Sequence, residues 1–189
     1  MNLDGGDVRP EPLDSVVARS PDGSLLLFES VRDGRGRLFT MTAHRTGPRE
    51  ITTARHAEQG SFSPDGRWIV FEQRDAMHEE IKRSEIVIAR PDGSEARVVA
   101  SGTDPKWSRD GRLILFKTWD DASQQLWIST VTAEGTNLRR LAPGVHPSWS
   151  PDNAQIAFMR DRADGGADIW IIGLDGNGER CITCKAPFR

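Results

Sequence analysis

Residues 78–82, His-Glu-Glu-Ile-Lys, resemble a catalytic metal motif more than any other stretch of this sequence does. Zinc proteases hold their metal with two imidazoles, which lie four residues apart on one face of a helix. Here Lys82 stands where the second histidine belongs, and the charged surroundings predict a hairpin loop. We therefore predict that this stretch is not a zinc protease site.

The two cysteines, Cys181 and Cys184, have the C-x-x-C spacing that serves both zinc binding and thiol–disulfide chemistry. A structural zinc site needs a second pair of ligands, and a redox pair is expected in a βαβ setting; the sequence shows neither. Residues three apart in an extended strand point to opposite faces, so even a disulfide would need a turn here. We predict incidental thiols, no metal site and no cofactor.

The rest of the sequence shows no sign of a covalent catalyst. It has no Gly-x-Ser-x-Gly nucleophile elbow and no phosphate-binding loop, and its four histidines have no spacing that supports a triad. The net charge is -3, with 25 basic residues spread among 28 acidic ones, which is no footprint for nucleic acid. No apolar run approaches the roughly 20 residues that span a bilayer. We expect no enzyme activity, no nucleic-acid partner and no membrane insertion.

Residues 1–14 are acidic and polar, with glycines and prolines that interrupt regular structure. They lack the charged start and the apolar middle of a secretory signal. We expect a flexible lead-in. As written, the chain is expected in the cytoplasm, and export to the periplasm is the alternative if a signal has been removed.

A four-residue turn motif, Ser-Pro-Asp-Gly, recurs four times and organises the chain. Its first residues are 43, 45 and 42 positions apart. Proline fixes φ at the first corner of a turn, aspartate accepts backbone hydrogen bonds, and glycine supplies a positive φ. Arg109 replaces the proline of the third copy, and Asn153 replaces the glycine of the fourth. We predict a structural role for the motif residues Ser20, Pro21, Asp22, Gly23, Ser63, Pro64, Asp65, Gly66, Ser108, Asp110, Gly111, Ser150, Pro151 and Asp152.

Short apolar runs between polar turns predict four strands in each repeat, and no helical periodicity appears. The second strand of every repeat ends its apolar run in phenylalanine. Repeats of this length, filled with strands, are typical of β-propellers. We predict an all-β fold, a propeller domain over residues 15–189 after the lead-in. Its four four-stranded antiparallel blades are expected at about 15–53, 54–101, 102–143 and 144–184.

This repeat resembles the Pro-Asp, WD-like repeat of TolB-type β-propellers. The likeness covers about residues 15–184 and is carried by the turn motif, the run ending in Phe, Leu-Trp or Ile-Trp in the third strand, and a closing Arg-x-Leu/Ile-Thr/Ala. Propeller domains of prolyl oligopeptidase relatives have similar repeats. The resemblance implies a propeller that binds a protein or a small ligand on one rim.

Four repeats are fewer than the six or more that TolB-type propellers usually have. We therefore expect an open arc or part of a larger propeller. The first and last blades of an open arc would expose apolar faces, and such faces mark association sites. This predicts self-association through the terminal blades, for example an arc completed by a second copy.

One candidate binding rim consists of Gln59, Asp104 and His146, which stand four residues before the motif serine; Val16 has this place in the first repeat. The loops that enter the innermost strands should bring these side chains to one mouth of the channel. A small cation or a polar ligand could bind there, and a solvated ring of loops is the alternative.

A second candidate rim lies in the middle hairpins, where an aspartate recurs at positions 33, 75, 120 and 161. Turn chemistry explains such a recurrence, and an acidic rim for a basic or polar partner is the alternative. The longest of these hairpins spans residues 73–84. Its composition favours a charged solvated loop, and the alternative is recognition of a protein partner through Asp75, His78, Glu79 and Glu80.

Three functions compete. The favoured one is a non-enzymatic TolB-like scaffold that binds a protein or ligand through one rim. The alternative is the propeller portion of a larger prolyl oligopeptidase-like hydrolase. The third is a lyase or hydrolase that acts through a metal at the channel mouth.

Overall fold

The computed structural model of the chain describes residues 15–32, 34–52, 56–74 and 84–184. These residues form sixteen β-strands and no helix. The strands make four separate antiparallel sheets of four strands each. The predicted all-β fold with four four-stranded units is confirmed.

Each sheet is a meander, in which strands that follow one another in the chain are hydrogen-bonded neighbours. The first sheet contains β1 (Ser15–Arg19), β2 (Leu25–Arg32), β3 (Arg35–Thr42) and β4 (Arg49–Glu50). The second contains β5 (His56–Phe62), β6 (Ile69–Arg74), β7 (Glu85–Ala89) and β8 (Arg97–Ser101). The third contains β9 (Thr103–Trp107), β10 (Leu113–Asp120), β11 (Gln125–Thr132) and β12 (Arg139–Pro143). The fourth contains β13 (Val145–Trp149), β14 (Gln155–Asp161), β15 (Ala167–Gly173) and β16 (Arg180–Cys181).

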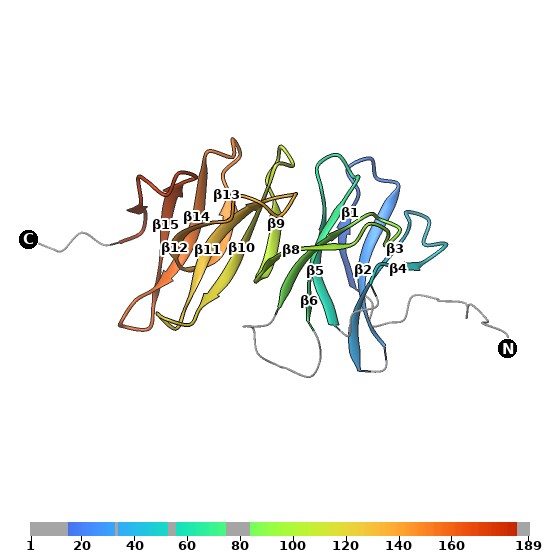
Figure 1. The fold of residues 1–189 in the computed structure, drawn as a ribbon, viewed down its shortest axis with the longest axis horizontal. Coiled ribbons are helices and arrows are strands. Elements are labelled where there is room, and N and C mark those ends of the chain that lie inside the picture. Colours follow the sequence, from blue (N-terminus) through green and yellow to red (C-terminus); the bar gives the residue numbers. More distant parts are fainter. Residues whose placement is uncertain (1–14, 33, 53–55, 75–83, 185–189) are drawn as a thin grey trace, which may run out of the picture.

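The four sheets follow one another along the long axis of the molecule (Figure 1). The first sheet, in blue, lies at one end, and the fourth sheet, in orange and red, lies at the other. The first and last sheets therefore do not meet, and the arc of blades is open.

The hydrophobic core lies between neighbouring sheets. Because side chains alternate between the two faces of a strand, one strand serves two cores. In β6, Phe71 packs in a cluster with Leu27 of the first sheet, whereas Val70 packs with Ile114 of the third sheet. All four side chains are completely buried. Burial of each such side chain stabilises the fold by about 1.5–3 kcal/mol, so the inner sheets are held on both faces.

Hydrogen bonds of the serine and aspartate side chains hold the recurring turns. In the second copy, Ser63 Oγ donates to Asp65 Oδ1 (2.6 Å) and accepts from the backbone N–H of Trp68 (3.0 Å). The same serine and aspartate bonds recur in the other three turns. In the first copy, the hydrogen bond from Ser20 lowers the pKa of Asp22 to about 2. The turn aspartate is therefore charged, and a good acceptor, at neutral pH.

Neighbouring turns also contact one another. A side chain on Gly66 would meet the ring of Pro21, because its Cβ would lie 3.4 Å from the proline Cδ. The junction between the third and fourth turns is different: the backbone N–H of Arg109 donates to Asn153 Oδ1 (3.0 Å). Proline has no N–H to donate, and glycine has no side chain to accept. Asn153 tolerates the positive φ of this position (59°). The two departures from the motif therefore compensate each other.

We expect this compensation to appear as thermodynamic coupling between the two positions. Arg109→Pro and Asn153→Gly should each remove the same hydrogen bond and lower the free energy of unfolding by about 0.5–1.5 kcal/mol. The double variant restores the proline–glycine contact of the other turns. Its loss should therefore be smaller than the sum of the single losses by about 0.5 kcal/mol or more.

Urea denaturation of the four proteins measures this coupling. Glu134→Gln, at an exposed side chain in another turn, is a control and should change stability by less than about 0.5 kcal/mol. Strictly additive losses in the double variant would contradict the compensation.

Candidate functional site

The three residues predicted to ring a channel mouth lie inside strands. Gln59 belongs to β5, Asp104 to β9 and His146 to β13, the first strand of each of the last three sheets. The expectation that they occupy loops is wrong. Each has a positive φ (57°, 57° and 51°), and the pairing with the next strand shifts register there. They form β-bulges, which let the strand pair on both sides of an irregular residue.

Two of these bulges direct a backbone N–H toward the preceding sheet. The N–H of Gln59 donates to Glu29 Oε1 (2.6 Å), and the N–H of Asp104 donates to Glu72 Oε2 (3.2 Å). Both glutamates directly follow the core phenylalanine of the second strand. The turn motif does not point to these glutamates, although the Phe-Glu pair in the first two repeats is a usable signal. These bonds link neighbouring sheets at their inner strands.

Glu72 is the more deeply buried of the two glutamates. Its side chain is 3% exposed, whereas Glu29 is half-buried. Burial raises the pKa of Glu72, and the hydrogen bond from Asp104 acts in the opposite direction. The junction between the second and third sheets therefore contains a carboxyl group whose charge is disfavoured by its surroundings.

The next junction has the opposite charge. Lys117 follows the core phenylalanine there, in the place of the two glutamates. The carboxylate of Asp104 lies 3.7 Å from Lys117 Nζ and 3.5 Å from Lys106 Nζ. Asp104 is thus engaged with two ammonium groups, while Gln59 and His146 are exposed. A ligand-binding role for the three residues stays a prediction.

The residues predicted to form the partner loop lie outside the described part of the chain: Asp75, His78, Glu79 and Glu80. The recurring aspartate of the middle hairpins can be followed at Asp120. The backbone N–H of Ser123 donates to its carboxylate (3.0 Å), as does the Ser123 hydroxyl, and Arg140 Nη1 lies 3.2 Å from Oδ1. The hydroxyl bond, and then the arginine, lower the pKa of Asp120 to about 2. At this position the aspartate holds a turn.

A cleft of about 520 Å³ lies between the third and fourth sheets, beside the turn that joins β10 to β11. Arg160 lines it, but its guanidinium donates to Pro143 O (3.1 and 3.0 Å) and to Glu179 Oε1 (2.6 Å). The same guanidinium lies 4.5 Å from the ring centroid of Trp170. Arg160 therefore clamps the two sheets together and is not available to bind an anion.

The outer face of the fourth sheet is open. In every sheet, the residue that follows the core phenylalanine of the second strand pairs with an aliphatic residue of the third strand. These aliphatic residues are, in sheet order, Leu38, Ile86, Ile128 and Ile169. The first three are completely buried against the next sheet, but Ile169 is 44% exposed. Its neighbours on this face are exposed as well: Met159 pairs with Ile169, and Ile182 N–H donates to Ile169 O. We call Met159, Ile169 and Ile182 the open face.

Cys181 and Cys184 form a disulfide, so the prediction of incidental thiols is wrong. β16 ends at Cys181, and the next two residues form a bend that brings the two Cα atoms to 5.6 Å. The early end of the strand supplies the turn that the spacing alone did not promise. Asp168 of β15 lies beside the pair, and the Thr183 hydroxyl donates to its Oδ1 (3.0 Å).

Comparison with known families places the fold. A family model described as the TolB beta propeller domain matches residues 11–145. The comparison with curated proteins found no match. Among the described residues, no helix has the length and apolarity that crossing a bilayer would require.

Solved structures with similar folds are longer than this chain. A putative TolB from Agrobacterium tumefaciens superposes with a TM-score of 0.69 at 19% identity, over 86% of this chain and 62% of that one. TolB from Acinetobacter baumannii gives 0.71 at 16% identity, over 87% and 42%. A puromycin-hydrolyzing peptidase from Mycobacterium tuberculosis gives 0.67 at 16% identity, over 88% and 30%. At these identities the likeness concerns the fold.

Glu72 generates a prediction about pH. Since its folded-state pKa is raised, its contribution to stability is complete below its ordinary pKa of 4.5 and is lost as pH rises through the raised value. Glu72→Gln keeps an oxygen acceptor for the Asp104 N–H and removes the charge. The free energy of unfolding of this variant, relative to the original protein, should therefore increase between pH 4 and pH 8 (roughly the range over which a raised carboxyl titrates).

Urea denaturation at several pH values measures this difference. Glu29→Gln is the matched control, because Glu29 makes the same contact from a half-buried position. A Glu72→Gln difference that stays flat or falls with pH would show that burial of this carboxyl does not matter.

Proposed function

The chain belongs to the TolB β-propeller domain family, and on this premise we propose that it is a non-enzymatic scaffold that binds a protein partner. The observation that carries the proposal is the open face of the fourth sheet. In the first three sheets, the residue equivalent to Ile169 is buried against the next sheet. In the fourth sheet, no blade of the described chain covers this face.

The chemistry of the open face favours a protein surface as its occupant. Ile169 and Ile182 are 44% and 50% exposed, and Met159 is 36% exposed. Neighbouring apolar side chains exposed together on one face are a feature of surfaces at which proteins associate. Covering them would give the fourth sheet what each inner sheet already has, an apolar neighbour on both faces.

In this proposal, the partner that covers the open face is a second copy of this chain. A head-to-tail arrangement would need the matching face of the first sheet, but Phe28, Phe39 and Met41 there are at most 4% exposed. Two open faces, by contrast, can pack on each other about a two-fold axis. Such an interface uses the same patch on both copies and closes at the dimer. The proposed assembly is therefore a symmetric dimer through β13–β16.

Light scattering of the purified chain tests this. We expect a mass of twice 21.0 kDa that falls toward the monomer on dilution, with no larger polymers. Ile169→Lys should shift the equilibrium to monomer, because a lysine in the interface would bury an unpaired charge. Leu138→Lys changes another apolar side chain of similar exposure (56%) away from the open face, and should dimerise normally.

A chain that stays monomeric at every concentration, or an Ile169→Lys variant that dimerises like the original, would overturn the assigned surface. Circular dichroism of each variant keeps loss of fold separate from loss of association.

The alternative function is the propeller portion of a larger prolyl oligopeptidase-like hydrolase. The likeness to the puromycin-hydrolyzing peptidase supports it, since that chain is more than three times as long as the matched part. In that case further blades of the same polypeptide would cover the open face. The coding sequence that adjoins this one decides between the two, because a prolyl oligopeptidase-like hydrolase requires a Gly-x-Ser-x-Gly elbow.

A further inference from the structure

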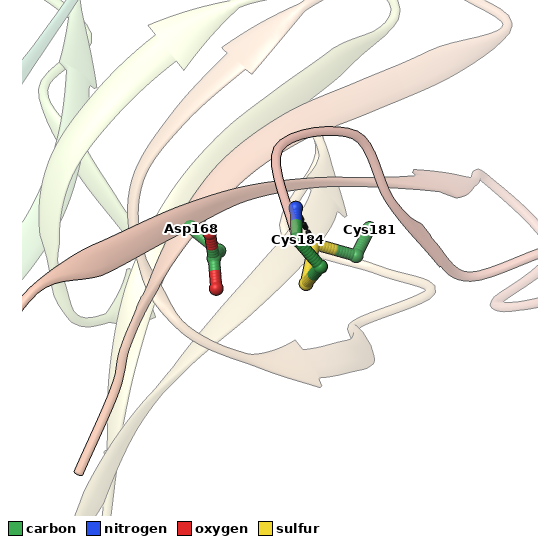
Figure 2. A group of neighbouring side chains, drawn as sticks. All are labelled: Asp168, Cys181 and Cys184. Atoms are coloured by element: carbon green, nitrogen blue, oxygen red, sulfur yellow. Dashed lines mark hydrogen bonds between the residues drawn. A yellow bond between two sulfur atoms is a disulfide. The ribbon is translucent and has the colours of Figure 1, made fainter. Parts of the chain in front are cut away.

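Three potential metal ligands meet at the outer edge of the fourth sheet. The ligand atoms of Asp168, Cys181 and Cys184 all lie within 4.8 Å of one another, and no other group of three such side chains occurs in the described residues. Figure 2 shows the carboxylate of Asp168 beside the sulfur atoms of the two cysteines. Asp168 comes from β15, fifteen residues before the bend at Thr183.

We propose that, once the disulfide is reduced, Cys181, Cys184 and Asp168 bind a zinc ion. Two thiolates and one carboxylate are ligands that Zn²⁺ accepts, and a water molecule completes a four-coordinate site. The soft sulfur ligands favour Zn²⁺ over hard cations such as Mg²⁺ and Ca²⁺. This site is not the metal site at the channel mouth that the sequence suggests as a third possible function.

The geometry of the pair suits chelation. The two Cα atoms are 5.6 Å apart, so both sulfurs can reach one ion without a change of the bend. In a tetrahedral site with Zn–S bonds of about 2.3 Å, the sulfurs must lie about 3.8 Å apart. Rotation of the two side chains provides this separation once the S–S bond is broken. Cys184 is exposed, so the ion has a path of entry.

The surroundings of the carboxylate are those of a metal ligand. Asp168 is 6% exposed, and Thr183 Oγ1 (3.0 Å) and Arg162 Nη1 (3.5 Å) both donate to its Oδ1. These bonds engage Oδ1 and orient the carboxylate, which leaves Oδ2 available to the ion, as outer-shell partners do in zinc sites. Arg162 also offsets the excess negative charge of three anionic ligands around a divalent cation.

The backbone contributes to one of the sulfurs. The N–H of Cys184 donates to Cys181 Sγ (2.9 Å), a bond that would stabilise the thiolate after reduction. The ring closed by the disulfide is very small, and small rings restrict the unfolded chain least. A staple for stability is therefore a weak explanation of the pair.

Loading needs a reductant, for which a small dithiol suffices. It transfers two electrons and two protons to the protein disulfide and closes into its own cyclic disulfide, so that one S–S bond is exchanged for another. The two cysteine thiols then lose their protons to the buffer as Zn²⁺ binds.

Cobalt(II) titration of the reduced, anaerobic protein tests the site, followed by competition with Zn²⁺. We expect one Co²⁺ per chain, thiolate-to-cobalt charge-transfer absorption, and displacement by Zn²⁺. The oxidised protein should show none of these. Cys184→Ser leaves one thiolate, so the absorption band of a site with two thiolates should be lost. Asp168→Asn should weaken the affinity for Co²⁺ by at least about tenfold, as the loss of a ligand or of its hydrogen-bond partners does.

Asp175→Asn is the matched control, since Asp175 is a turn aspartate of the same sheet, at an exposed position away from the cysteines. It should bind as tightly as the original protein. Equal affinity of Asp168→Asn, or cobalt binding without a thiolate band, would overturn the proposal and mean adventitious binding only. Thermal melts of the reduced variants, without metal, show whether each has kept its fold.

Discussion

The structure depends on one constraint: a sheet that is apolar on both faces must be covered on both. The inner strands satisfy it by alternation, with Phe71 and Val70 in separate cores on opposite sides of β6. At the first sheet Phe28, Phe39 and Met41 are at most 4% exposed, whereas the outer face of the fourth sheet is covered by no blade of the described chain. Ile169 has the same place in its sheet as Ile86, which is completely buried, and yet it is 44% exposed. Exposure there follows from the position of the sheet, because the residue type has not changed.

The parts of the fold that the sequence predicted are those set by local chemistry. Each turn is closed within six residues, from Ser63 to Trp68 in the second copy, so its residue types can be recognised without knowing the fold. The strands are equally local, since their apolar runs are short and bounded by turns. Asn153 is an example, because it replaces the motif glycine and adopts the positive φ (59°) that this place in the turn requires.

The parts that escaped prediction depend on contacts between repeats. The bulge at Gln59 is fixed by Glu29, thirty residues earlier, and the bulge at Asp104 by Glu72. A period in the sequence shows that positions are equivalent, but it does not show which of them touch across a junction. For this reason the period predicts loops at three residues that form strand bulges, and it shows at Arg109 only that the motif proline is missing. In the structure, the backbone N–H of Arg109, which a proline would lack, donates to Asn153 Oδ1.

The cysteine pair shows the same limit in chemical terms. Spacing gave two ligands and no third, because the third is on β15 and reaches the pair only through the pairing of β15 with β16. The place where β16 ends also decides what the two sulfurs can do: a strand that continued to Cys184 would send them to opposite faces. Ile182 lies between the cysteines and belongs to the open face, so the ring closed by the disulfide restricts part of the surface assigned to association. The bend between the two cysteines thus carries both the disulfide and Ile182 of the open face. Reduction of the disulfide therefore removes a restraint on part of that face.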